Sequence, residues 1–314
     1  SFLMNVSLKA ANVIVFILIS RKTGVEQAGI FSLSTIYLLV LSAMLIGLDE
    51  LIVRQVARDH CQAKQIFSSY LFLRLILSGI LYVCFYLIIV FAMKYPENTR
   101  NACLIIGFCL IPDGISGTGQ ALLAGYERFG VSFFSAILSG TVKVAGALFF
   151  LGGENSVIMV GYIWLAGSWL AAMIVFVTAV YQVGGIRIPK RVESLISSQE
   201  VRMSVPFLLI SLVSILEFQV DVFMLSKMQG EFALGLYSAV TTITSSLILI
   251  SQAYRAAVYP VMIRLYKASA FSLMRVYQLS MFGLGLLVLP MAIGLILLGP
   301  RIVVWIYSPQ FTAS

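Results

Sequence analysis

The sequence predicts an all-α integral membrane protein, a polytopic helical bundle whose two halves are copies of each other. Three observations support this. Of the 314 residues, 60% are hydrophobic and only 11% are charged, and the mean hydropathy is +1.00, which is the composition of a membrane protein. Apolar runs of about 20 residues, the length of a helix that crosses ~30 Å of hydrocarbon, follow one another along the chain. Two segments 206 residues apart also share a pattern of serines and glycines.

Nine segments are predicted to cross the membrane as helices, and an incomplete tenth begins near the end. Their approximate ranges are 3–20, 27–48, 69–93, 101–124, 130–151, 156–181, 204–227, 233–254 and 277–298. The loops between them predict the orientation, because cytoplasmic loops carry an excess of Lys and Arg. Twelve of the 21 cations fall in the loops of one side and six in the loops of the other. We therefore expect a multi-pass protein with its N-terminus in the cytoplasm.

The repeat is clearest where residues 19–32 (ISRKTGVEQAGIFS) are compared with residues 225–238 (LSKMQGEFALGLYS). At a constant spacing, Ser20, Gly24, Gly29, Ser32 and Gly79 recur as Ser226, Gly230, Gly235, Ser238 and Gly285. Internal repeats of this kind are typical of transporters built from two related bundles. With about six spans in each half, the predicted parts are an N-terminal six-helix bundle (1–182), a cytoplasmic linker (183–203) and a partial C-terminal bundle of about three spans and the start of a fourth (204–314). The second half is then truncated, and we expect a chain that is incomplete at its C-terminus.

The seventh predicted span carries acids in its middle. Ser211, Ser214, Glu217 and Asp221 have the spacing i, i+3, i+6 and i+10, so they lie near one stripe of a helix. An Asp at the centre of a membrane helix costs about 2.5–3.5 kcal/mol on insertion scales, and such residues normally face a cavity or a partner. We interpret Glu217 and Asp221 as candidate sites for a coupling cation.

Other predicted spans also have charged or polar positions. These are Asn5, Lys9 and Asn12 in the first span, Arg74 in the third, Asp113 in the fourth and Lys143 in the fifth. The cations are candidates for holding a phosphate or an acidic sugar in a central cavity, and Asp113 is a third candidate for the coupling cation. Two plainer explanations stay open. Small polar residues pack membrane helices closely, and a pair such as Lys9 and Asp221 would be a structural ion pair.

The rest of the sequence gives no sign of a cofactor, a metal site or a catalytic site. His60 is the single histidine and the four cysteines have no CxxC spacing, so we expect no metal. The sequence lacks GxxxxGK[ST], the phosphate-binding loop of nucleotide-driven proteins, so we expect an ion gradient to supply the energy. No loop on the predicted outer side is long enough for a polymerase or ligase site, which argues against an enzyme. The basic residues are spread between the spans, which argues against nucleic-acid binding.

Five stretches of the chain are distinctive. They are TGVEQAGIFSLS (23–34), GLDELIVRQVARD (47–59), LLAGYERF (122–129), PFLLISLVSILEFQVDVFMLSKMQGEFALGLYSA (206–239) and QAYRAAVYPVMIRLY (252–266). Together they resemble the polysaccharide transporter family, the O-antigen flippases of the multidrug/oligosaccharidyl-lipid/polysaccharide (MOP) exporter superfamily. The resemblance covers essentially the whole chain. It implies a bacterial inner-membrane protein whose two bundles are related by an axis along the membrane normal.

The resemblance also implies a substrate, an oligosaccharide on undecaprenyl diphosphate that moves from the cytoplasmic to the periplasmic leaflet. Asp221, in DVFML, matches the family's acidic position on helix seven. Lys9, Arg74 and Lys143 would meet the diphosphate, although their choice depends on spacing in this sequence. The implied partners are H⁺ or Na⁺, membrane lipids and the polysaccharide polymerase and chain-length machinery. The alternatives are a small-molecule cation antiporter of the same superfamily and a purely structural scaffold, which would not need five buried charges.

Overall fold

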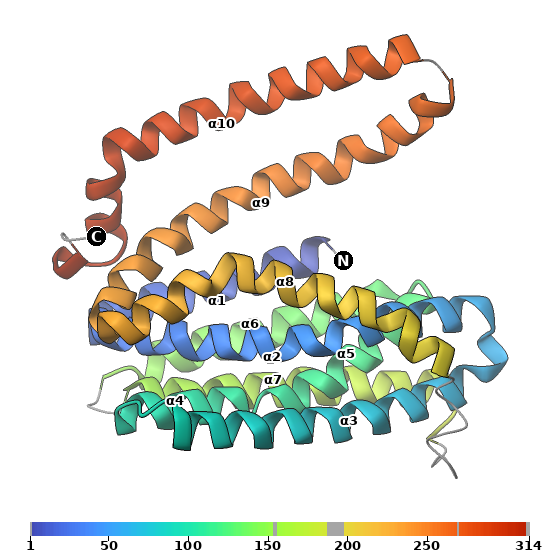
Figure 1. The fold of residues 1–314 in the computed structure, drawn as a ribbon, viewed down its shortest axis with the longest axis horizontal. Coiled ribbons are helices and arrows are strands. Elements are labelled where there is room, and N and C mark those ends of the chain that lie inside the picture. Colours follow the sequence, from blue (N-terminus) through green and yellow to red (C-terminus); the bar gives the residue numbers. More distant parts are fainter. Residues whose placement is uncertain (1, 153–155, 187–197, 269, 312–314) are drawn as a thin grey trace. The chain divides into compact units, whose positions relative to one another are not determined.

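We describe a computed structural model of the chain, which covers residues 2–152, 156–186, 198–268 and 270–311 (Figure 1). These residues form α-helices and short 3₁₀ or π segments, and none of them is in a strand. The elements are α1 (Phe2–Thr23), α2 (Val25–Arg58), η1 (His60–Gln62), α3 (Ala63–Leu87), η2 (Ile88–Ala92), α4 (Glu97–Gly107), α5 (Leu110–Gly125), α6 (Phe129–Phe150), α7 (Ser156–Val183), α8 (Ser198–Met228), α9 (Gly230–Ala268), α10 (Ala270–Ile306) and η3 (Pro309–Phe311).

Seven helical segments of the described chain are long and apolar enough to cross a membrane, which confirms the predicted polytopic helical protein. They are α2, η1–α3–η2, α4–α5, α6, α7, α9 and α10. The first and seventh predicted spans are also helices, α1 and α8, and both contain residues whose side chains lie outside the described set. The two are equivalent in the repeat.

The fourth predicted span is broken into α4 and α5, whereas the sequence suggested one helix over 101–124. Pro112 has no N–H to donate to the carbonyl of Phe108, four residues earlier. The Ile111 N–H donates to that carbonyl instead at 3.2 Å, which tightens the turn locally. The break shifts the direction of the chain just before Asp113, a candidate site residue.

The chain divides into two compact units, one of residues 3–235 and one of residues 236–314. The first holds α1 to α8 and the first residues of α9. Its main apolar cluster joins α2, α3, α5 and α7 through Ile52, Phe67, Tyr70, Leu122 and Ala179, all buried. In the second unit the Tyr307 hydroxyl donates to the carbonyl of Ala239 at 3.1 Å, and its ring lies 5.3 Å from that of Phe311. The predicted boundaries of the two halves concern the repeat and stay a prediction.

Hydrogen bonds near the ends of helices show which of those ends lie close together in the first unit. At one end, Lys22 donates to the carbonyl of Leu148; we call it the Gly24 end, after the glycine between α1 and α2. At the other, the His60 end, Lys64 donates to the carbonyl of Gly184 and Tyr126 to that of His60. The charge pattern of the loops predicts that the Gly24 end is extracytoplasmic.

The repeat predicted from the sequence is also visible in the backbone. Gly24, between α1 and α2, has φ = 93°, and its equivalent Gly230, between α8 and α9, has φ = 81°. Both values lie in the left-handed region that glycine adopts without steric cost. The same sharp turn therefore joins the first two helices of each half.

Candidate functional site

Arg74 is held inside the first unit by an ion pair. Its guanidinium lies on α3, is only 5% exposed, and forms a salt bridge with the carboxylate of Asp49 on α2. The pairing uses both terminal nitrogens, the second at 3.3 Å from Oδ2, which is the fork geometry that favours arginine over lysine. The Nε atom is buried and has no hydrogen-bond partner among the described residues. The pair explains how a charge is tolerated in the middle of an apolar helix.

The position of the guanidinium depends on a glycine of α5. A Cβ atom at Gly117 would lie 2.8 and 2.9 Å from the two terminal nitrogens of Arg74. Such distances are too short for a side chain to fit, so the absence of a Cβ lets the arginine lie flat against α5. At Gly114, one turn earlier, a Cβ would meet Arg74 at an ordinary 3.7 Å.

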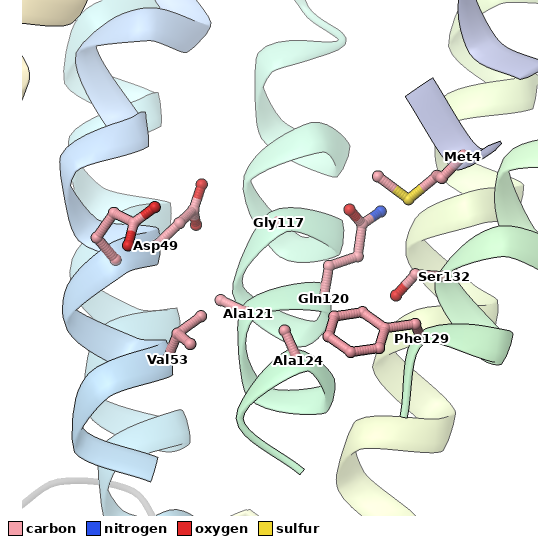
Figure 2. Close-up of a pocket in the computed structure, with 10 residues that line it drawn as sticks. Met4, Asp49, Val53, Gly117, Gln120, Ala121, Ala124, Phe129 and Ser132 are labelled. Carbon is pink, nitrogen blue, oxygen red and sulfur yellow. The ribbon is translucent and has the colours of Figure 1, made fainter. Parts of the chain in front are cut away.

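A pocket of about 200 Å³ opens beside this pair, between α1, α2, α5 and α6 (Figure 2). Its lining residues are Met4, Asp49, Glu50, Val53, Gly117, Gln120, Ala121, Ala124, Phe129 and Ser132. The Gln120 side chain points between Asp49 on one side and Met4 and Ser132 on the other (Figure 2). The ends of α1, α2, α5 and α6 that form the pocket lie at the His60 end of the first unit. The pocket is smaller than the ~300–1,000 Å³ of typical small-molecule sites, so it fits one small polar group at most.

Lys143 and Asp113 form the second charged cluster. Lys143, on α6, is 8% exposed, and its ammonium lies 4.2 Å from the centre of the Trp164 ring on α7, within cation–π range. Asp113, on α5, interacts electrostatically with Lys143 and Arg74 and lies within hydrogen-bonding reach of the Ser168 hydroxyl. The fit is close, because a Cβ at Gly167 would lie 2.9 Å from Cγ of Lys143.

The structure therefore brings three predicted site residues, Arg74, Asp113 and Lys143, into the interior of the first unit. Each cation faces a carboxylate from another helix, Asp49 or Asp113. Arg74 is paired with Asp49 in a salt bridge, and Lys143 interacts electrostatically with Asp113. Neither cation is exposed as an unoccupied anion receptor, and Asp113 is not an open cation site.

The acids of α8 have a different environment. Asp221 and Glu217 are both exposed, and Asp221 accepts a hydrogen bond from the backbone N–H of Val222 at 2.8 Å. Ser214, on the same stripe, is exposed as well, while the side chain of Ser211 lies outside the described residues. The predicted polar stripe is thus accessible on α8, away from the paired charges of the bundle.

The candidates on α1 are divided between two environments. Lys9 is partly buried and Asn12 is exposed. The side chain of Asn5 lies outside the described residues.

Two partners of the buried cations were missed in the sequence. Asp49 lies one residue beyond the second predicted span (27–48) and was not chosen as a site residue, whereas in the structure it pairs with Arg74 near the end of α2. A search for an acid that could neutralise Arg74 would have found it. Trp164 gave no signal, because an aromatic residue in an apolar span is usually core or lipid-facing.

The fold is shared with solved transporters at low sequence identity. One is the inward-facing conformation of a multidrug resistance MATE family transporter of the MOP superfamily, with a TM-score of 0.74 at 16% identity over 98% of this chain and 74% of that one. Its outward-facing conformation gives 0.62 at 17% identity over 99% and 74%. A MOP superfamily transporter from Pyrococcus furiosus, described as having a binding pocket of reverse polarity, gives 0.69 at 16% identity over 99% and 74%.

At the level of sequence, no curated protein matches the chain. The family model of polysaccharide biosynthesis proteins (Polysacc_synt_3) matches residues 18–314, nearly the whole length. Together with the transporter fold, this match confirms the resemblance seen in the motifs. The chain belongs to the polysaccharide biosynthesis protein family, and its fold is that of solved MOP superfamily transporters.

Proposed function

We propose that this membrane transporter flips an undecaprenyl-diphosphate-linked oligosaccharide, such as an O-antigen repeat unit, across the bacterial inner membrane by alternating access. The observation that carries the proposal is the polysaccharide biosynthesis family match on a transporter fold. A lipid-linked sugar is the form in which an oligosaccharide can stay anchored in the bilayer while its polar part crosses. The chain's N-terminus is cytoplasmic, in line with the excess of Lys and Arg on that side.

The path of the polar headgroup runs along the first helix of each half. α1 and α8 are the equivalent first helices of the two halves, and both carry charged residues within an apolar sequence: Lys9 in α1, and Glu217 and Asp221 in α8. Such residues within a membrane protein usually line a cavity. Lys9 and Asn12 of α1, with Asn5 on the same face, contact the diphosphate or the sugar. Arg74 and Lys143 already interact with the carboxylates of Asp49 and Asp113. They contribute to binding only when an acidic group of the substrate displaces those carboxylates.

The energy comes from a cation gradient. Of the three candidate acids, Glu217 and Asp221 are exposed, so H⁺ or Na⁺ binds there rather than at Asp113, which interacts with Lys143. Membrane lipids surround the apolar helices, and the polymerase and chain-length machinery receives the flipped unit.

The test is to express the protein in a bacterium that makes a known surface glycan but lacks its flippase. Recovery of the glycan, and its loss again in Asp221→Asn at equal membrane abundance, supports the proposal. Efflux of an organic cation without any glycan recovery would favour the small-molecule antiporter instead.

The coupling ion is tested separately on purified protein in liposomes. Transport of a fluorescent lipid-diphosphate oligosaccharide is measured with an imposed pH gradient and then with an imposed Na⁺ gradient. A rate that responds to neither gradient would contradict ion coupling while leaving the flippase proposal standing.

A further inference from the structure

A set of contacts at the Gly24 end joins the start of the second half to the first half. We call it the clasp. It comprises Tyr37 of α2, Met93 and Tyr95 of the α3–α4 connection, Thr99 of α4, Phe223, Ser226 and Lys227 of α8, and Glu231 of α9. All of these residues belong to the first compact unit.

A chain of hydroxyl groups crosses the centre of the clasp. The Tyr95 hydroxyl lies 3.1 Å from that of Tyr37 and 3.3 Å from that of Ser226, so one tyrosine links α2 to α8. The ring of Tyr37 also lies 4.9 Å from that of Phe223. Ser226 is 6% exposed, so water does not reach this centre freely.

Two charged side chains of the second half are held by the first. The Thr99 hydroxyl, itself buried, donates to Glu231 Oε1 at 3.0 Å. Lys227 donates to the carbonyl of Met93, and its ammonium lies 4.0 Å from the centre of the Tyr95 ring. Hydrogen bonds to a charged group are the stronger kind, so both contribute to closing this end.

The backbone that presents Tyr95 and Met93 is shaped for these contacts. α3 ends in a π-helical turn (Ile88–Ala92), a feature frequent at functional sites. Lys94 then has φ = 47°, a left-handed conformation that costs a non-glycine residue energy. Strain of this kind persists where the surrounding contacts enforce it, and here they lie on both sides of Lys94.

The clasp surrounds a crossing of two equivalent glycines. A Cβ at Gly29 of α2 would overlap the carbonyl oxygen of Glu231, and a Cβ at Gly235 of α9 would overlap that of Val25. Val25 corresponds to Glu231 and Gly29 to Gly235 in the repeat. Each contact is thus the image of the other, as at an isologous interface.

Among the described side chains of α8, the buried ones lie near the clasp. Val222 and Ser226 are buried, whereas the large apolar side chains earlier in the helix are exposed: Leu209, Ile210, Val213, Leu216, Phe218 and Val220. Closure at the Gly24 end thus coincides with accessibility towards the other end, where Glu217 and Asp221 are also exposed.

From this geometry we propose that the clasp is the extracytoplasmic gate of the transporter, and that the Gly29–Gly235 crossing is the point about which it closes. Release of Lys227 and Glu231 from the first half opens the end at which the substrate leaves. The inference rests on the proposed function for the identity of that substrate and for the orientation of the chain. Gating itself is measured without any substrate.

The experiment places a reporter cysteine at Ser226 in a chain whose four native cysteines are replaced by serine. A membrane-impermeant thiol reagent is added to intact cells and its rate of reaction is measured. Gly29→Ala and Gly235→Ala, introduced singly, prevent close approach of the helices. We expect each to raise the rate about tenfold, the change produced by ~1.4 kcal/mol of destabilisation of the closed state.

The matched control is the other pair of equivalent glycines, Gly79 and Gly285. A Cβ at either position meets nothing within 4 Å, so Gly79→Ala and Gly285→Ala should leave the rate unchanged. Equal rates in all four alanine variants, or reaction only from the cytoplasmic side in inverted vesicles, would overturn the proposal.

A milder variant covers the case in which an alanine prevents folding. Tyr95→Phe keeps the ring under Lys227 and removes only the two hydroxyl contacts, so it should raise the rate by a smaller factor at normal membrane abundance. An unchanged rate in this variant would also count against the gate. Failure of glycan complementation with these labelling results intact would instead reject the flippase proposal alone.

Discussion

Arg74 and Lys143 are tolerated inside the first unit because a carboxylate from a different helix faces each of them. Pairing with a carboxylate offsets the free-energy cost of removing a cation from water. Loss of one partner leaves the other charge buried and uncompensated, which destabilises the fold. Their local role is therefore to fix α3 against α2 and α6 against α5. Any role in transport is added to that constraint.

The first prediction concerns the ion pair of Arg74 and Asp49. Arg74→Met leaves a carboxylate without its partner and should destabilise the protein, towards the lower end of the 3–5 kcal/mol typical of a broken buried pair, because the Asp49 side chain is 32% exposed. The double variant Arg74→Met/Asp49→Leu should recover most of that loss. Thermal unfolding of the detergent-purified protein measures both, and equal melting temperatures of the two variants would contradict a coupled pair.

The second prediction concerns Gly117, against which Arg74 lies. Gly117→Ala places a Cβ 2.8 Å from a guanidinium nitrogen and should destabilise the fold by about 1–3 kcal/mol, as overpacking does. Gly114→Ala, on the same helix, meets only ordinary contacts and should be neutral or slightly stabilising, because alanine favours a helix by ~1 kcal/mol over glycine. The same unfolding measurement decides, and a loss at position 114 as large as that at 117 would disprove the steric explanation.

Among the elements, α8 and the α4–α5 pair show what sequence reasoning can and cannot reach. The acidic stripe of α8 was visible, since spacing alone places Glu217 and Asp221 on one face. The environment of Asp113 was not, because it depends on Lys143 and Ser168 from two other helices. Periodicity reports which residues share a face and carries no information about what lies opposite.

The third prediction compares the acids of these two elements. Asp221→Asn keeps the oxygen that accepts the Val222 N–H and removes the charge of an exposed side chain, so it should lower stability less than the loss of a buried charge while transport is lost. Asp113→Asn removes the carboxylate that faces the buried Lys143 and should lower stability as well. Melting temperature and glycan export, measured on both variants, separate the roles; a large melting-temperature loss in Asp221→Asn would make that acid structural.

For the whole molecule, the repeat was the most informative feature of the sequence. The spacing of 206 residues related Gly24 to Gly230 and Gly29 to Gly235, and the structure gives the first pair matching positive φ angles and brings the second pair together. The roles of these glycines could be predicted from the sequence, because a positive φ angle and the close approach of two helix backbones both require a residue without a side chain. The partners of Arg74 and Lys143 were not readable, since side chains that meet across helices leave no fixed spacing.

The last prediction tests the orientation of the whole chain, on which the assignment of the gate depends. Cys61 is exposed and lies in the turn between α2 and α3, at the His60 end. Gly152 is exposed at the Gly24 end, and a Cβ there meets nothing within 4 Å, so Gly152→Cys fits without strain. In a background without the other cysteines, an impermeant thiol reagent should label Cys61 only in inverted vesicles and Gly152→Cys only in intact cells, because the loops that the sequence assigns to the cytoplasmic side carry twelve cations against six. The opposite pattern would place the N-terminus outside and turn the clasp into a cytoplasmic gate.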